Sequence, residues 1–271
     1  GMKPDEMNLE KLVKKLGNQP KEKEALEKLQ IAPADRPGLP EGVVLRVQDL
    51  CMYFGGVHAV DGLSFDVKKG EIFGLIGPNG AGKTTVFNCI TQFYKPTSGT
   101  LLFENKAGEV ISLPEEKVHD VVLQGIVRTF QNVEAIREVS VLDNLLIAGH
   151  RQFTAGILSQ ALHLPTLKKQ ERIIREKALR VLEFMGLTEY RDWYAAGLPY
   201  GILKKIEIAR TLMCDPQLII LDEPAAGLND TETLELAELI RRIRDTMGCT
   251  ILLVEHDMGL VMNICQTVCA I

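Results

Sequence analysis

Residues 77–85 read GPNGAGKTT, a short glycine-rich stretch that fits the pattern GxxxxGK[ST]. The apolar run EIFGLIG leads into it, and helix-forming residues follow from about Lys83 to Phe93. A strand, a glycine-rich loop and a helix in this order form a recurring phosphate-binding unit. The stretch therefore predicts an α/β fold in which this loop joins a central strand to a helix.

The residue types in this loop suit a nucleoside triphosphate. Gly77, Gly80 and Gly82 let the backbone curl so that its N–H groups point inward, and the following helix adds its positive N-terminal end. We expect Lys83 to reach the β- and γ-phosphates and Thr84 to hold Mg²⁺. The predicted nucleotide-binding segment comprises Gly77, Pro78, Asn79, Gly80, Ala81, Gly82, Lys83, Thr84 and Thr85.

Two more apolar runs, PQLIILD and TILLVEH, are typical of central parallel strands and end in polar residues. Asp222 ends the first run, where it is expected to support Mg²⁺ through water or Thr84. Glu223 follows directly, and a carboxylate there can orient and deprotonate an attacking water. His256 ends the second run, and we expect it to hydrogen-bond the γ-phosphate and that water.

The rest of the chain divides by composition. Residues 1–42 combine an amphipathic turn, a charged stretch and a proline-bearing linker, and they predict either a mobile extension or a docking helix for a partner. From residue 43 onward strand and helix signals alternate. Residues 113–215 are mostly helical in pattern, which predicts a helical insertion in a parallel α/β core.

Composition excludes several classes of protein. The chain is 46% hydrophobic and 25% charged, as in ordinary soluble proteins, and its net charge of −5 argues against nucleic-acid binding by bulk electrostatics. No apolar run is long enough to span a bilayer, and the charged start predicts no secretion signal. The six cysteines show no metal-binding spacing, which predicts reduced thiols in a cytosolic protein.

These motifs together resemble the nucleotide-binding subunit of ABC transporters, from about residue 44 to the end of the chain. The likeness rests on GPNGAGKTT, LDEPAAGLND, VEHD and the candidate glutamine loop GIVRTFQN. Stretches such as YFGGVHAVDGLSFDV and VLDNLLIAGH bring it nearest to the ATPases of branched-chain amino-acid importers. The resemblance implies a P-loop NTPase cassette with a parallel-sheet core, a small antiparallel β subdomain and a helical insertion, and it implies further elements beyond Ile271.

The resemblance also assigns roles to single residues. Phe54 matches the aromatic residue that stacks on adenine, whereas Tyr53 points to the other side of its strand. Gln131 matches the glutamine that touches Mg²⁺ and the attacking water and senses the membrane subunit. Asn229 stands where the family usually has an aspartate, which weakens the crosswise contact between two subunits.

The segment LPYGILKKIEIAR, residues 198–210, lies where the family places its signature motif. In the family this motif closes over ATP bound to the opposite subunit. Gly201 and the helix after it keep a helix N-terminus for the γ-phosphate, and Tyr200 and Gly201 are the expected contacts. Pro199 removes a hydroxyl and an N–H donor, and Ile202 removes a polar side chain. Lost hydrogen bonds of this kind weaken the composite site by roughly ten- to a hundredfold, so we expect an impaired or tuned signature.

The resulting expectation is an ATP-hydrolysing subunit that powers an importer from the cytoplasmic face of the membrane. Its cofactors are ATP and Mg²⁺, and its partners are membrane-spanning permease subunits and a second ATPase subunit, identical or different, without nucleic acid. Two alternatives stay open. One is a soluble ABC-type ATPase without a membrane partner; the other is a regulatory, low-activity cassette, favoured by Pro199 and Asn229 but opposed by the complete catalytic set.

Overall fold

A computed structural model describes residues 38–129, 135–157 and 165–271. Most of the expected N-terminal extension, residues 1–42, therefore lies outside the described residues. Residues 39–271 form one compact unit. Along the chain, the strands of two sheets alternate with the helices that pack on them.

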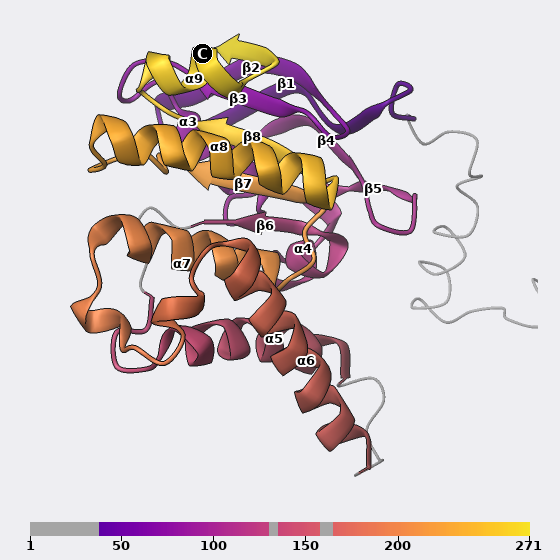
Figure 1. Ribbon diagram of the computed structural model, residues 1–271. Helices are drawn as coiled ribbons and strands as arrows, with labels where there is room; N and C mark the ends of the chain where they lie inside the picture. The colour runs from indigo at the N-terminus through magenta and orange to yellow at the C-terminus, as the bar shows by residue number, and fades with distance from the viewer. Residues whose placement is uncertain (1–37, 130–134, 158–164) are drawn as a thin grey trace, which may run out of the picture. The chain divides into compact units, whose positions relative to one another are not determined.

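The first sheet is antiparallel and small (Figure 1). It contains β1 (Val43–Phe54), β2 (Val57–Lys68), β4 (Ser98–Glu104) and β5 (Val110–Ser112), in the order β2-β1-β4-β5. β1 has buried side chains mostly at alternate positions, as expected for a strand with one face on a core. This sheet is the antiparallel β subdomain that the family likeness implied.

The second sheet is parallel and carries the motifs. Its order is β6-β7-β8-β3-β9, formed by β6 (Ile126–Arg128), β7 (Leu218–Asp222), β8 (Thr250–Val254), β3 (Ile72–Ile76) and β9 (Thr267–Ala270). Every residue of β7 and β8 is buried, which confirms the prediction that these apolar runs are central strands. Because the strands are parallel, the ends of β3, β7 and β8 meet at one edge of the sheet.

Side chains of the parallel sheet alternate between two hydrophobic cores. Ile219, Leu221 and Leu253 point into the core that also contains buried side chains of the helices between residues 141 and 213. Ile220 and Leu252 point into the core shared with the antiparallel sheet. The parallel sheet is therefore the layer between the two cores, and both cores hold its strand ends in place.

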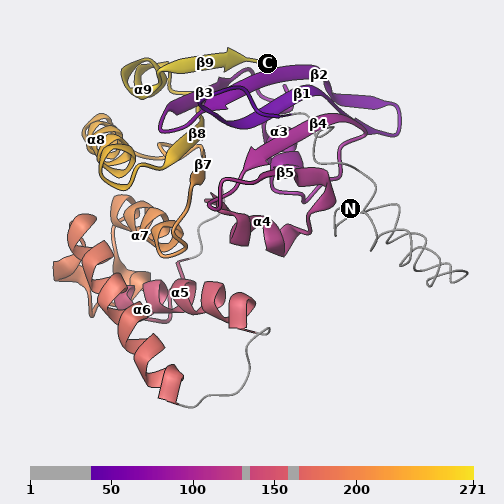
Figure 2. The same ribbon diagram turned by 90° about the vertical axis from the view of Figure 1, so that its right-hand side faces the viewer.

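Helices complete the fold, and they lie on both sides of the parallel sheet. Figures 1 and 2 show α5, α6 and α7 gathered beyond the β6 edge of that sheet, whereas α8 lies along β7 and β8. None of the described helices is long and apolar enough to cross a membrane. The helices are α3 (Lys83–Ile90), α4 (Val118–Gln124), α5 (Val141–Ile157), α6 (Pro165–Phe184), α7 (Tyr200–Leu212), α8 (Asp230–Met247) and α9 (Met258–Ile264), with short 3₁₀ turns at Leu113–Glu115, Thr188–Tyr190 and Ala195–Gly197.

Candidate functional site

The glycine-rich loop joins β3 to α3, as the sequence predicts, and it needs glycine at its last turn. Gly82 immediately precedes α3 with a φ of 97°, and a Cβ atom there would lie 2.2 Å from the carbonyl oxygen of Ala59. Gly80 also has a positive φ, of 82°, but its surroundings are open. The loop is therefore shaped by backbone conformation at Gly80 and by both conformation and close packing at Gly82.

Lys83 is buried, and its side chain turns back into the loop. Its Nζ donates hydrogen bonds to the carbonyl oxygens of Gly77 at 2.6 Å and Pro78 at 2.8 Å. The ammonium group thus lies inside the loop and contributes a positive charge to the cavity. Thr84, the next residue, is exposed at the start of α3.

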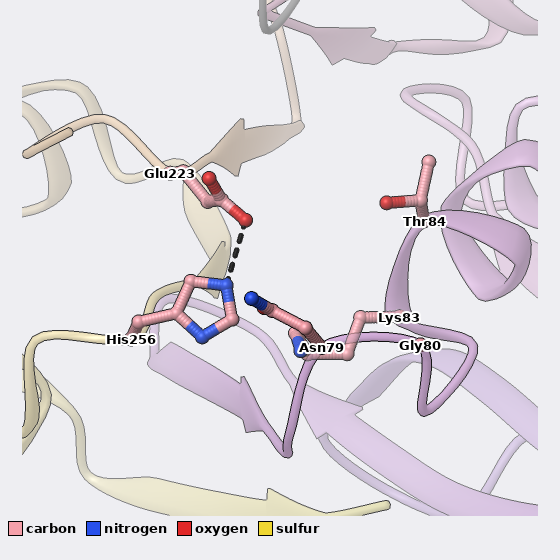
Figure 3. Close-up of a pocket in the computed structure, with 6 residues that line it drawn as sticks. All are labelled: Asn79, Gly80, Lys83, Thr84, Glu223 and His256. Carbon is pink, nitrogen blue, oxygen red and sulfur yellow. Dashed lines mark hydrogen bonds and ion pairs between the residues drawn. The ribbon is translucent and has the colours of Figure 1, made fainter.

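Glu223 and His256 come from the ends of neighbouring strands and contact each other. Nε2 of His256 lies 2.8 Å from Oε1 of Glu223. Figure 3 marks this contact with a dashed line. Glu223 has a φ of 48°, a conformation that non-glycine residues adopt only under local strain and that recurs at functional sites. Its N–H donates to the carbonyl oxygen of Val254 at 2.9 Å, so the register of β7 and β8 fixes the pair.

These residues share one open cavity of about 390 Å³. Figure 3 shows Glu223 and His256 on one side of it, facing the loop and the start of α3 on the other. The volume is within the usual range for small-molecule sites. The cavity is lined by Asn79, Gly80, Lys83, Thr84, Glu223 and His256, all of which the sequence predicted for the site.

Asp222 ends β7, where it is almost fully buried. Its backbone N–H donates to Oγ1 of Thr129 at 3.3 Å, and its Oδ2 accepts a hydrogen bond from Nη2 of Arg128 at 2.5 Å. Arg128 was not among the residues predicted for the site. A basic residue ending a short apolar segment, in GIVRTFQN, was the available signal, but its partner could not be read from the sequence.

A divalent metal ion fits this site only if the nucleotide supplies part of its coordination. The described residues contain no group of three or more His, Cys, Asp or Glu side chains that could hold a metal alone. Thr84 and Asp222 offer oxygen atoms, which Mg²⁺ prefers, and this ion usually completes its shell with phosphates and waters. The donor types therefore fit Mg²⁺ bound together with a triphosphate.

Glu255 is a second residue that the sequence analysis missed. Its Oε1 accepts from the N–H of Ala225 at 2.6 Å, and its Oε2 accepts from the N–H of His256 at 3.0 Å. Burial raises the pKa of the Glu255 carboxyl, and these backbone donors partly oppose that rise. The carboxylate joins the loop after Glu223 to the loop carrying His256, so it positions both. The available signal in the sequence was the position of Glu255, between an apolar strand and His256.

Phe54 ends β1 and is 44% exposed, with its ring packed edge to face against Tyr94 at a centroid distance of 5.2 Å. Tyr53 behaves differently, because its hydroxyl donates to Asp61 at 2.7 Å and its ring stacks on His58. Phe54 is thus the ring available to a ligand, and adenine stacking stays a prediction. Gln131, the predicted glutamine of the metal and water site, lies outside the described residues.

The signature segment lies at the start of α7, away from the cavity. Pro199 immediately precedes the helix, and Tyr200 lies half-exposed over Gly227, where a Cβ atom would be 3.0 Å from its ring. Ile202 packs against the hydrophobic core. Neither Tyr200 nor Gly201 lines the cavity, and their contact with a nucleotide stays a prediction.

Asn229 has a structural role that the sequence analysis did not assign. Its Oδ1 accepts from the N–H of Glu232 at 3.0 Å, and Oε2 of Glu232 accepts from the N–H of Asn229 at 3.0 Å. This reciprocal pair is a capping box at the start of α8. Since Asn and Asp cap helices about equally well, the cap itself does not require aspartate at this position.

The fold and the cavity define a P-loop nucleotide-binding cassette. The ABC transporter family model matches residues 60–226, and the chain belongs to this family as an ATPase. The match spans the glycine-rich loop, the signature segment, Asp222 and Glu223, so it covers most of the site described above.

Relatives and solved structures agree with this assignment. The chain is 46% identical over 221 residues to the high-affinity branched-chain amino acid transport ATP-binding protein LivG of Salmonella typhimurium, covering 82% of this chain and 85% of the relative. It is 44% identical to BraF of Pseudomonas aeruginosa, with the same coverage. The ADP conformation of MJ1267, an ATP-binding cassette of an ABC transporter, superposes with a TM-score of 0.71 at 34% identity, covering 84% of this chain and 87% of the other.

Proposed function

We propose that this chain binds and hydrolyses ATP with Mg²⁺ to power an importer of branched-chain amino acids. The observation that carries the ATPase part is the cavity in which Lys83, Glu223 and His256 meet. The cargo follows from the relatives, because LivG and BraF are named for branched-chain amino acid transport.

Binding of ATP begins at the loop. Lys83 exchanges the carbonyl oxygens of Gly77 and Pro78 for the β- and γ-phosphates, which are stronger acceptors because they are charged. The loop N–H groups and the N-terminus of α3 bind the remaining phosphate oxygens. Thr84 and Asp222 would hold Mg²⁺, which would neutralise part of the phosphate charge. Phe54 stacks on the adenine.

Hydrolysis uses the pair at the strand ends. Glu223 orients the attacking water and accepts its proton. His256 holds the Glu223 carboxylate through the 2.8 Å contact and reaches the γ-phosphate. Gln131, which lies outside the described residues, would contact the water and Mg²⁺ as the family likeness implies. Glu255 keeps the two loops at a fixed separation.

Transport requires partners. The N-terminus of α7, with Tyr200 and Gly201, closes over ATP held by a second ATPase subunit, and Pro199 weakens that contact. The helical segment, residues 113–215, docks on the permease subunits at the cytoplasmic face of the membrane. Two adjacent aromatic side chains in this segment, Trp193 and Tyr194, are 59% and 66% exposed, which supports a contact surface there.

ATP-dependent association tests the paired-subunit mechanism. Glu223→Gln retains ATP binding but slows hydrolysis, so light scattering in Mg²⁺-free ATP should detect a dimer. The matched double variant Glu223→Gln/Pro199→Ser restores the signature hydroxyl and should dimerise at a lower ATP concentration. A dimer supports closure between two copies of this chain. A monomer that binds ATP in both variants overturns self-pairing and requires a different second subunit.

Cargo is tested separately, in a bacterium that lacks its own LivG. Expression of this chain with its permease subunits should restore uptake of radiolabelled leucine. The Lys83→Ala variant is the control and should not restore it. Co-purification with the permease without leucine uptake would overturn the cargo, and failure to bind ATP at all would overturn the ATPase mechanism.

A further inference from the structure

A buried cation contacts the carboxylate expected to support Mg²⁺. Arg128 is the last residue of β6, and its Nη2 lies 2.5 Å from Oδ2 of Asp222. The two side chains are only 9% and 1% exposed. Among the ion pairs between described residues, few are as deeply buried, and a charge this deep is stable only with a partner.

Further contacts of Arg128 connect this pair to α3, the helix that begins beside the phosphate loop. Nη1 of Arg128 donates to Oδ1 of Asn88 at 2.6 Å, and its guanidinium lies over the ring of Phe87. Asn88 follows Thr84 by four residues in α3, so both project from the same face of that helix, one turn apart. Arg128 therefore joins the helix that carries Thr84 to the strand that ends in Asp222.

The charge on Arg128 must affect any cation that Asp222 binds. Hydrogen bonding to Arg128 occupies one of the two carboxylate oxygens. The guanidinium also offsets the negative charge of the Asp222 carboxylate, and electrostatic effects are strong where water is excluded. Two more charges line the cavity: Lys83 is a buried cation on the loop side, and Glu223 is an anion that follows Asp222.

We propose that Arg128 is the internal counter-ion of Asp222 and that it limits how strongly ATP binding depends on Mg²⁺. This inference rests on the proposed function, because it takes Asp222 as the carboxylate on the metal side of the site. In the chain without Arg128, Asp222 has no cation of its own. Mg²⁺ bound with ATP then supplies the missing positive charge, and the metal strengthens nucleotide binding more than it does in the native chain.

The test compares ATP dissociation constants measured by calorimetry in EDTA and in Mg²⁺. The readout is the constant in EDTA divided by the constant in Mg²⁺, so a larger ratio means that Mg²⁺ strengthens ATP binding more. Arg128→Met, which keeps length but removes the charge, should increase the ratio about tenfold, within the usual range of coupling between two sites. Arg128→Lys keeps the charge and should leave the ratio near that of the native chain. In the Asp222→Asn background, Arg128→Met should no longer change the ratio, because the carboxylate that needs a counter-ion is gone.

Further variants separate charge from folding. Arg128→Gln removes the charge but retains hydrogen bonding toward Asn88 and Asp222, so it tests the same point if Arg128→Met fails to fold. Arg46→Met is the matched control, because it removes the more exposed ion pair of Arg46 with Asp66 on the antiparallel sheet and should leave the ratio unchanged.

The outcomes are distinct. A larger ratio in folded, charge-removing variants, with a native ratio in Arg128→Lys, supports the inference. An unchanged or smaller ratio overturns it while leaving the proposed function intact, provided that the native chain binds ATP more tightly with Mg²⁺. A native chain whose ATP affinity does not respond to Mg²⁺ overturns the metal site itself, and the role of Arg128 with it.

Discussion

His256 contacts Glu223 through Nε2 and Oε1 at 2.8 Å, and this contact is built by strand pairing. Asp222 at the end of β7 pairs with Val254 at the end of β8, so the residues that follow the two strands emerge side by side. The geometry of the candidate base and its neighbour is therefore set by the register of the central sheet. Changes at either residue should alter catalysis more than folding.

Removing the imidazole tests this contact. His256→Ala should lower the ATP hydrolysis rate by about 10²–10⁴-fold, the usual range for a group that assists proton transfer, because Glu223 loses its neighbour. ATP affinity should change little, since the phosphates are held chiefly by the loop. Steady-state hydrolysis and equilibrium binding should be measured on the same preparations. A loss of affinity that matches the loss of rate would contradict this role.

Glu255 should contribute to stability in a pH-dependent way. Burial raises the pKa of its carboxyl above the usual 4.5, so the native chain holds this proton more tightly than the unfolded chain does. Its contribution to the free energy of unfolding is therefore largest below pH 4.5 and falls as pH rises through the raised pKa. Glu255→Gln should remove this fall, which urea unfolding across the acidic range measures.

The same substitution should also have a cost at neutral pH. A glutamine offers one acceptor oxygen where Glu255 uses two, so the N–H of Ala225 or His256 loses its partner, at about 1–3 kcal/mol. Glu104→Gln, at a more exposed carboxylate paired with Lys69, is the control and should have a smaller effect. Equal pH profiles for native and Glu255→Gln chains would contradict the assigned pKa shift.

The last glycine of the phosphate loop should not tolerate any side chain. Gly82→Ala adds a Cβ atom 2.2 Å from the carbonyl oxygen of Ala59, so the loop must shift and ATP binding should be lost. Gly248→Ala is the matched control, because it has a positive φ of 64° but open surroundings. It should cost only about 1–2 kcal/mol of stability, with ATP affinity retained. Normal ATP affinity in Gly82→Ala would contradict the close packing.

Cys51 should be the most reactive of the described cysteines at mildly alkaline pH. Hydrogen bonds to the Tyr53 hydroxyl, which Cys51 shares with Asp61, and to nearby groups lower the pKa of the Cys51 thiol. Burial raises the pKa of Cys89, Cys249 and Cys265 to about 11. A lower pKa gives more thiolate at a given pH, and the thiolate is the species that reacts. Mass spectrometry after brief iodoacetamide treatment measures the order of modification.

Tyr53→Phe supplies the comparison for that experiment. It removes the hydroxyl and keeps the ring, so Cys51 should react more slowly in this variant than in the native chain. Modification of Cys89 or Cys249 ahead of Cys51 in the folded chain would show that the assigned order of thiol pKa values is wrong.

The sequence predicted those parts of the fold and site whose signals are local. Continuous apolar runs marked β7 and β8, and the glycine-rich loop marked the turn into α3. The capping box of Asn229 and Glu232 was equally local, as a polar residue followed three positions later by glutamate, but the family comparison directed attention to another role for Asn229.

The remaining parts depended on which strands lie side by side. Arg128 meets Asp222 across 94 positions of sequence, and Glu255 meets Ala225 across 30. No periodicity or motif reports such neighbours, because they follow from strand order in the sheet. Without that order, Arg128 is only a charge at the end of an apolar segment, and Glu255 is only an acidic residue beside a histidine.

The two hydrogen bonds that Lys83 donates to Gly77 and Pro78 affect the turnover cycle. The loop is already folded around an ammonium group, so the conformational entropy of ordering it is lost during folding and not at each binding event. After product leaves, the lysine can return to the same two oxygens. The loop then keeps its shape between successive nucleotides, and each cycle starts from a preorganised phosphate-binding loop.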